Sequence, residues 1–153
     1  MKKNVRCPYC GREWETYEHP KPVVDIIIRV QGGVVLIRRK NPPYGWAIPG
    51  GFVDYNETVE AAARREAAEE TGLELTRLRL FGVYSDQTRD PRFHTISTVF
   101  TANGLGLPRA GDDAQDIGVF PESALPEGIV FDHPAILRDY FSRVRDCNSG
   151  VAN

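Results

Sequence analysis

Residues 51–73, GFVDYNETVEAAARREAAEETGL, decide how the chain folds. Residues 58–71 within this segment are rich in Ala, Glu and Arg, which are good helix formers. Gly72 follows at the position where a helix commonly ends on a left-handed residue. We therefore expect a helix over residues 58–71 that stops at Gly72.

Carboxylates crowd one side of this expected helix. At 100° per residue, Glu66 and Glu70 are neighbours on one face, and Glu69 lies about 60° from Glu66 on the other side. Like charges four residues apart repel each other unless a cation is close. Clustered carboxylate oxygens suit a hard divalent ion. The alternative is a solvated charged helix, which the favourable pair Arg65–Glu69 supports.

Strand-like segments lie on both sides of the helix. Residues 23–30, VVDIIIRV, and 34–38, VVLIR, are rich in β-branched residues, and the glycine-containing link between them predicts a β-hairpin. Further strands are expected at residues 78–84, 95–101 and 117–120, and a closing helix at residues 135–145, entered through Pro134. Strands interleaved with two helices predict a layered α/β or α+β domain.

The composition is that of one globular domain. The chain has 153 residues, with 19 Lys and Arg against 21 Asp and Glu, and 41% of them are hydrophobic. A net charge of −2 gives no basic surplus for binding nucleic acid, and no apolar run approaches the roughly 20 residues of a membrane span. The basic start lacks the apolar run of a secretory signal. Three cysteines, an odd number, do not suggest a disulfide framework, so we expect a cytoplasmic protein without nucleic-acid or membrane partners.

Residues 51–73 also resemble the signature of the Nudix hydrolase family: Gly, five residues, Glu, seven residues, Arg-Glu, an aliphatic, any residue, Glu-Glu, any residue, Gly, an aliphatic. The fixed positions are met by Gly51, Glu57, Arg65, Glu66, Glu69, Glu70 and Gly72. The lead-in IPGG at residues 48–51 is similar too, whereas Ala67 is smaller than the family's usual aliphatic residue. The resemblance implies a Nudix-type α/β/α sandwich with a mixed β-sheet, with the hydrolase domain over residues 23–147.

The resemblance further implies a metal-dependent hydrolase of nucleoside diphosphates linked to another moiety. The implied ligands of Mg²⁺ or Mn²⁺ are Glu66, Glu69 and Glu70. Such an ion neutralises the diphosphate and lowers the pKa of bound water. Arg65 would orient the cluster by pairing with Glu57, while Gly51 and Gly72 would permit turns at either end.

The acidic loop of residues 111–116 offers a general base. It resembles a later loop that often contributes a base or a metal ligand in this family. Asp113 is the first candidate and Asp116 the second. The alternative is an ordinary acidic surface turn.

Residues 41–54 and 83–97 look similar to the corresponding segments of microbial ADP-ribose pyrophosphatases. A guanidinium fork matches phosphate oxygens and an aromatic ring can stack on adenine. The expected phosphate ligands are Arg89 and Arg92, and the expected stacking partners are Tyr84, Trp46 or Phe93. The alternatives are surface ion pairs for the arginines and core packing for the aromatic residues. The implied reaction is ADP-ribose plus water giving AMP and ribose 5-phosphate.

Other functions remain open at this point. Another Nudix specificity, such as hydrolysis of NADH or of a nucleoside triphosphate, would use the same carboxylates. A non-catalytic, nucleotide-sensing Nudix module belongs to a different class, and the intact glutamates argue against it. A zinc-knuckle adaptor is a third possibility. Nudix hydrolases of this type are often homodimers, so we expect a homodimer.

Residues 1–22 are interpreted as a small appendage with half of a zinc-ribbon knuckle. Cys7 and Cys10 have the spacing of such a knuckle, but structural zinc usually takes four ligands. Cys147 and His19, or a second subunit, would have to complete the site, or the ribbon is degenerate and binds no metal. At the other end, residues 148–153 are expected to form a disordered tail.

Overall fold

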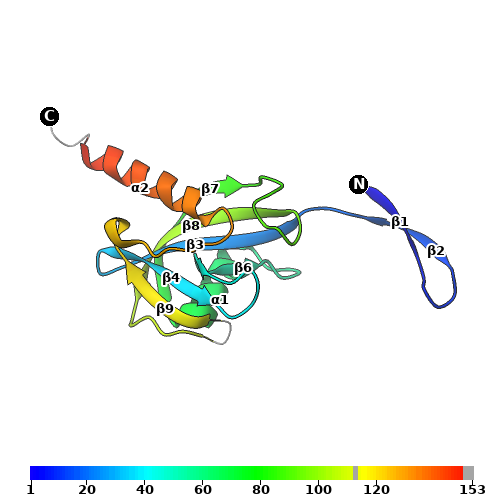
Figure 1. The fold of residues 1–153 in the computed structure, drawn as a ribbon, viewed down its shortest axis with the longest axis horizontal. Helices are drawn as coiled ribbons and strands as arrows, with labels where there is room; N and C mark the ends of the chain where they lie inside the picture. The colour runs from blue at the N-terminus through cyan, green and yellow to red at the C-terminus, as the bar shows by residue number, and fades with distance from the viewer. Residues whose placement is uncertain (112–113, 150–153) are drawn as a thin grey trace.

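The computed structural model describes residues 1–111 and 114–149 (Figure 1). Its strands are β1 (Lys2–Arg6), β2 (Glu13–Tyr17), β3 (Lys21–Val30), β4 (Gly33–Arg39), β5 (Trp46–Ala47), β6 (Gly50–Phe52), β7 (Glu74–Tyr84), β8 (Thr95–Leu105) and β9 (Ala114–Phe120). Its helices are α1 (Val59–Thr71), the short 3-10 helix η1 (Glu122–Ala124) and α2 (His133–Ser149). Among the described residues, no helix is long and apolar enough to cross a membrane.

The main sheet is mixed. Its strands follow the order β5-β4-β3-β8-β7, with β6 also pairing with β3 and β9 with β4. β8 runs parallel to β3, from Thr95 opposite Lys21 to Asn103 opposite Arg29, whereas the other pairs are antiparallel. β3 is central, and its long apolar run is buried on both faces, as expected for a strand with a helix on each side.

The two helices cover opposite faces of this sheet (Figure 1). Ile26 and Ile28 of β3 pack with the alanines of α1, while Ile27 packs with Ile136 and Leu137 of α2. Successive strand residues point to opposite faces, so one strand supplies both cores. The result is the expected α/β/α sandwich.

The expected elements are present, and the strands and the closing helix are longer than expected, whereas α1 begins one residue later. β3 and β4 form the predicted hairpin through a turn in which Gln31 has φ 48° and Gly32 has φ 84°. The closing helix extends over His133–Ser149, so residues 148 and 149 of the expected disordered tail are helical instead. Residues 150–153 lie outside the described residues. The short strands β5 and β6 were not expected from the sequence.

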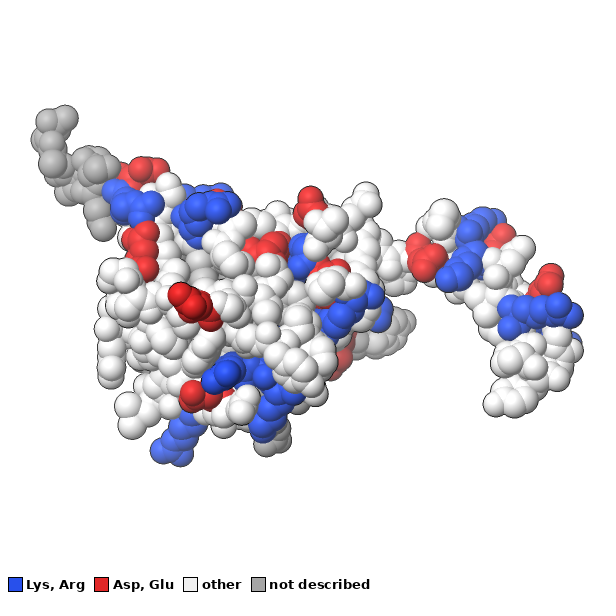
Figure 2. Space-filling view, in the orientation of Figure 1, with Lys and Arg blue, Asp and Glu red and all other residues white. Residues whose placement is uncertain are grey.

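The appendage is a two-stranded hairpin, β1 paired with β2, that stands clear of the main body (Figures 1 and 2). Its strands were not expected, because their sequences are polar and mostly exposed. The domain boundary drawn at residue 22 falls inside β3, which begins at Lys21.

Candidate active site

Helix α1 ends at Gly72 as the sequence predicted, and it begins after Thr58, which the sequence analysis had placed inside the helix. Thr58 caps the start, where its Oγ1 accepts a hydrogen bond of 3.2 Å from the Ala61 N–H. Gly72 caps the end with φ 67°, and its N–H donates to the Ala68 carbonyl at 3.0 Å. The side chains that bring the helix close to the sheet are small and buried: Ala62, Ala63 and Ala67.

Arg65 uses its whole guanidinium to order the acidic residues. Nε and Nη2 donate to the two carboxylate oxygens of Glu57 at 2.9 and 2.8 Å. Nη1 donates to Glu66 at 2.7 Å and to Glu69 at 3.1 Å, and Nη2 also donates to the Phe52 carbonyl at 3.0 Å. These five bonds match the five N–H donors of an arginine. The expected pairing of Arg65 with Glu57 is therefore present.

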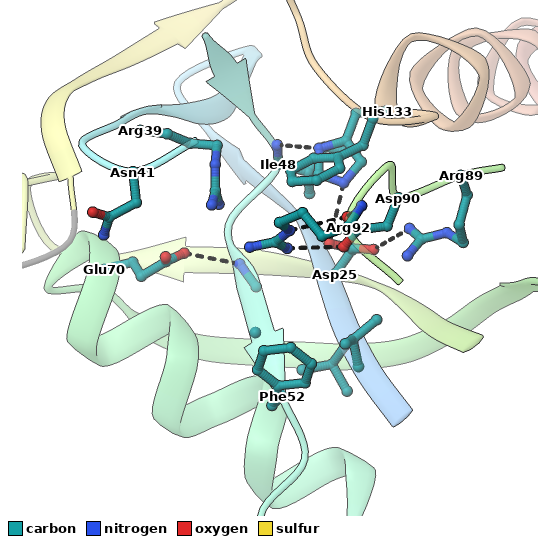
Figure 3. Close-up of a pocket in the computed structure, with 15 residues that line it drawn as sticks. Asp25, Arg39, Asn41, Ile48, Phe52, Glu70, Arg89, Asp90, Arg92 and His133 are labelled. Carbon is teal, nitrogen blue, oxygen red and sulfur yellow. Dashed lines mark hydrogen bonds and ion pairs between the residues drawn. The ribbon is translucent and has the colours of Figure 1, made fainter. Parts of the chain in front are cut away.

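Glu66 and Glu70 both face strand β6. Glu70 Oε2 accepts a hydrogen bond of 2.8 Å from the Gly50 N–H (Figure 3). A Cβ at Gly51 would lie 2.3 Å from Glu66 Oε1, closer than any real contact. Gly51 has no positive φ, so it was expected to permit a turn but instead permits the close approach of a carboxylate.

Burial sets the electrostatics of these carboxylates. Desolvation raises the pKa of Glu70 to about 8; the nearby charge of Glu66 raises it too, while the Gly50 N–H lowers it. Burial also raises the pKa of Glu66, although the hydrogen bond from Arg65 lowers it. Hydrogen bonding to Arg65 lowers the pKa of Glu57. Glu66 and Glu70, the two α1 carboxylates that face β6, are thus the ones that a neighbouring positive charge would stabilise most.

The three glutamates expected to bind metal do not converge on one point. The Glu69 side chain is 59% exposed and pairs with Arg65 at 3.1 Å. Glu70, in contrast, is buried beside Gly50. Over residues 1–111 and 114–149, no three His, Cys, Asp or Glu side chains gather closely enough to hold a metal ion. The donor set nevertheless fits Mg²⁺ or Mn²⁺, because it consists of carboxylate oxygens. Glu66 and Glu70, which face β6, have raised pKa values that a cation would lower.

A pocket opens beside Glu70 (Figure 3). It is bounded by β3, by residues 48–52, and by three loop segments carrying basic and aromatic side chains. The charged and polar residues that line it are Asp25, Arg39, Asn41, Glu70, Arg89, Asp90, Arg92 and His133. Its aromatic walls are Phe52 and Phe131. The pocket therefore combines anionic and cationic groups at one end of α1.

Arg89 is expected from the sequence to grip phosphate, but the structure buries it. Its Nη2 donates to Asp25 and to Asp132, each at 2.9 Å, its Nε donates to Asp132 at 3.0 Å, and its Nη1 donates to Thr95 at 2.8 Å. Only 6% of Arg89 is exposed. The alternative interpretation as an ion pair was right about the pairing and wrong about its place, which is interior and not on the surface.

Asp25 is the centre of a buried network that the sequence analysis missed. It accepts a 2.5 Å hydrogen bond from Ser97, and its Oδ1 lies 3.3 Å from His133 Nε2. His133 Nδ1 accepts from the Ile48 N–H at 2.9 Å, so the ring hydrogen lies on Nε2 and faces Asp25. Burial alone would raise the pKa of Asp25, but His133, Arg89 and Ser97 lower it to about 2. The signal available in the sequence was an aspartate inside an otherwise apolar strand.

Arg92 lies at the pocket wall, with its side chain 37% exposed. Its Nη2 donates to Asp90 at 2.8 Å, and its guanidinium carbon is 5.4 Å from the centre of the Phe131 ring. Arg39 approaches the same ring at 5.0 Å. Phe131 thus lies within cation–π distance of two guanidinium groups that border the pocket. Its φ is 61°.

The remaining predicted residues lie apart from the pocket or outside the described residues. The Tyr84 hydroxyl donates to Asp139 at 2.9 Å, and Trp46 packs edge-on against Phe120 at 5.0 Å. Neither lines the pocket, so core packing, the alternative interpretation, describes both. Phe93 instead contacts the pocket residue Phe52, at 5.7 Å between ring centres. Asp113 lies outside the described residues, and Asp116 accepts a hydrogen bond from Ile117 N–H at 2.8 Å.

Comparison with known proteins agrees with this geometry. Residues 19–140 match the NUDIX domain. The chain is 46% identical over 132 residues to an ADP-ribose pyrophosphatase of Methanocaldococcus jannaschii, covering 84% of this chain and 78% of the relative. A MutT/nudix family protein from Enterococcus faecalis has a similar structure, with a TM-score of 0.76, 29% identity and coverage of 90% of this chain and 67% of that one.

A third relative is a bifunctional NMN adenylyltransferase/ADP ribose pyrophosphatase from Francisella tularensis, crystallised with AMP and a Mn ion. Its TM-score is 0.71 at 28% identity, and the match covers 83% of this chain and 42% of that one. The family match spans most of the chain, and the signature residues occupy the site described above. The chain therefore belongs to the Nudix hydrolase family.

Proposed function

We propose that the protein is a divalent-metal-dependent ADP-ribose pyrophosphatase, which converts ADP-ribose and water to AMP and ribose 5-phosphate. The observation that carries the proposal is the row of α1 carboxylates: Arg65 orders Glu66 and Glu69, and Glu70 lines a pocket. The same pocket also holds Arg39 and Arg92. A diphosphate needs both kinds of group, because it is anionic and must be held while water attacks phosphorus. The 46% identical relative named for this activity supports the choice of substrate.

Glu66, Glu69 and Glu70 are the proposed ligands of Mg²⁺ or Mn²⁺. Such an ion, when bound, offsets the charge of the diphosphate and lowers the pKa of its bound water. Arg65 then acts as a positioning residue, since it contacts the carboxylates and not the pocket. The manganese ion named with the Francisella tularensis structure supports this class of metal.

The pocket suggests how the rest of the substrate is held. Arg92 and Arg39 are the proposed phosphate ligands, and Phe52, backed by Phe93, is the proposed platform for adenine. Arg89 lines the pocket too, but its bonds to Asp25 and Asp132 favour a role in holding the pocket wall. Asp113 and then Asp116 remain the candidates for the general base.

The protein is also proposed to act as a homodimer in the cytoplasm. Cys7, Cys10 and Cys147 are free thiols, and this supports a reducing compartment. A soluble nucleotide substrate requires no nucleic-acid or membrane partner.

The test is a substrate panel run with Mg²⁺ or Mn²⁺. ADP-ribose, NADH, dGTP and diadenosine polyphosphates are incubated with the full chain, and the products are identified by chromatography. Glu66→Gln, Glu69→Gln and Glu70→Gln are assayed beside Glu60→Gln, a control for an exposed glutamate on the same helix. AMP and ribose 5-phosphate, lost in the first three variants and kept in the control, are the expected result.

Each other outcome excludes part of the proposal. Turnover of a different compound keeps the metal-dependent hydrolysis and rejects ADP-ribose as the substrate. Tight nucleotide binding without turnover of any compound identifies a sensing module. Full activity in the three glutamine variants rejects the α1 carboxylates as the reactive site.

A further inference from the structure

The tip of the N-terminal hairpin is a folded cysteine knuckle. The turn from Cys7 to Arg12 is closed by the Cys7 N–H donating to the Arg12 carbonyl at 2.9 Å and by the Gly11 N–H donating to the Cys7 carbonyl at 3.0 Å. Gly11 has φ 72°, which a side chain rarely allows.

The closed turn at the hairpin tip suits the cysteine pair to a metal ion. A thiolate, and not a thiol, is the metal ligand. The turn at the hairpin tip carries Cys7 and Cys10 at the C-x-x-C spacing that zinc sites use. A structural zinc ion takes four such ligands, so this knuckle supplies half of a site.

One chain cannot supply the other half from its own described residues. His19 lies beyond the open end of the hairpin, since Arg6 pairs with Glu13 next to the tip and Lys2 with Tyr17 at the base. Six residue steps separate His19 from Glu13, and β2 makes up the first four of them, so the extended length is about 20 Å. Cys147 lies near the end of α2, at the opposite end of the molecule from the hairpin (Figure 1). Completion of the site by Cys147 and His19, one of the sequence expectations, is therefore wrong for a single chain.

We propose that two copies of this chain share one zinc ion through Cys7 and Cys10 of each copy. A tetrahedral site has a twofold axis that passes between its two pairs of ligands, so two identical knuckles can meet around zinc as a symmetric dimer. The hairpin stands clear of the body (Figure 2), and Cys10 at its tip is exposed.

Charge and surface at the tip favour a second copy. One zinc ion with four thiolates carries a formal charge of about −2, which Arg6 and Arg12 of both copies, flanking the thiols in sequence, would offset. Tyr9 is 96% exposed and Trp14 is 48% exposed on the same hairpin. An isolated two-stranded hairpin is marginally stable in water, so a shared metal and buried aromatic rings would stabilise it.

The test measures metal content and mass together. The full chain is purified under reducing conditions with zinc present, zinc is quantified by plasma mass spectrometry, and the oligomeric state is measured by light scattering. The expected result is about 0.5 zinc per chain in a dimer. Cobalt substituted for zinc should give the visible spectrum of a tetrahedral four-thiolate site.

Variants separate this site from the active site. Cys7→Ser and Cys10→Ser should each lose the metal, while Cys147→Ser should keep it. All three should keep hydrolysis of ADP-ribose, because the knuckle lies outside the pocket, so failure of the proposed function does not affect this test. A full equivalent of zinc on a monomer, a metal-free protein, a Cys7–Cys10 disulfide under these conditions, or zinc retained in both knuckle variants would each overturn the proposal.

Discussion

Arg65 and Glu57 form a two-bond ion pair, at 2.9 and 2.8 Å, that ties the first half of the signature segment to the second. The same guanidinium holds Glu66 and Glu69, so a single side chain sets the spacing of three carboxylates. The arrangement depends on a planar donor group with five N–H bonds, which only arginine offers.

Replacement of Arg65 by lysine is therefore not conservative. Arg65→Lys should lower kcat for ADP-ribose by about 10- to 100-fold, because an ammonium group cannot hold Glu57 and Glu66 together. Arg64→Lys is the control, since Arg64 donates to the Leu75 carbonyl and to none of these acids. Steady-state kinetics with unchanged circular dichroism would check the prediction, and equal activity of both variants would contradict it.

Gly51→Ala should damage activity more than stability. Its Cβ would meet Glu66 Oε1 at 2.3 Å, and the flexible carboxylate would move away from β6. A displacement of this size costs on the order of 100-fold in rate. Gly82→Ala is the control in strand β7, where the nearest atom would be 3.6 Å away. The prediction is wrong if Gly51→Ala unfolds the protein or leaves kcat unchanged.

Variants of Phe52, which lines the pocket, and of Tyr84, which does not, test which aromatic ring binds the substrate. Phe52→Leu should raise KM for ADP-ribose by roughly tenfold through loss of a stacking surface. Tyr84→Phe should leave kcat and KM unchanged, because the Tyr84 hydroxyl bonds to Asp139 on α2 and does not face the pocket. A Tyr84→Phe variant with the larger rise in KM would restore the expectation drawn from the sequence.

Arg92 is expected to act in binding more than in chemistry. Arg92→Gln should raise KM for ADP-ribose about tenfold with a smaller effect on kcat, since a charged hydrogen bond to phosphate is made before the reaction. Arg138→Gln, an exposed arginine on α2, serves as the control. If kcat falls and KM stays constant, Arg92 acts in the transition state alone.

Asp25 should make the free energy of unfolding depend on pH in the acid range. Its pKa is about 2 in the folded chain against an ordinary 3.8, so its stabilisation is complete above pH 3.8 and is lost as pH falls towards 2. The loss should be about 2 kcal/mol of unfolding free energy.

Substitution of Asp25 tests the same buried hydrogen-bond network with Arg89. Asp25→Asn should remove that pH dependence and destabilise the protein by about 3 kcal/mol near neutral pH, because Arg89 would lose one of its two acidic partners inside the protein. Glu15→Gln, which breaks the exposed pair with Lys2, should cost less than about 1 kcal/mol. Urea unfolding at several pH values measures both, and a similar cost for the two variants would reject the network as a source of stability.

Local pattern predicted the long elements of the sandwich but not its short ones. The alanine- and glutamate-rich helix and the β-branched strand at residues 23–30 carry their signals within one window of sequence. β5 and β6 have two and three residues and exist only because β4 and β3 pair with them. The strands of the β1–β2 hairpin are mostly polar, so no alternation of apolar residues predicts them.

The sequence by itself determined the row of glutamates, the arginine among them and the end of α1 at Gly72, because helical geometry relates residues only a few positions apart. Only the tertiary structure decided that Glu70 is buried while Glu69 is exposed, and that Arg89 pairs inside the protein with Asp25, 64 residues away. It also decided which aromatic rings reach the pocket and that His19 and Cys147 lie far from the cysteine knuckle. These relationships depend on how strands and helices pack across the sheet, and that information is not contained in any local stretch of sequence.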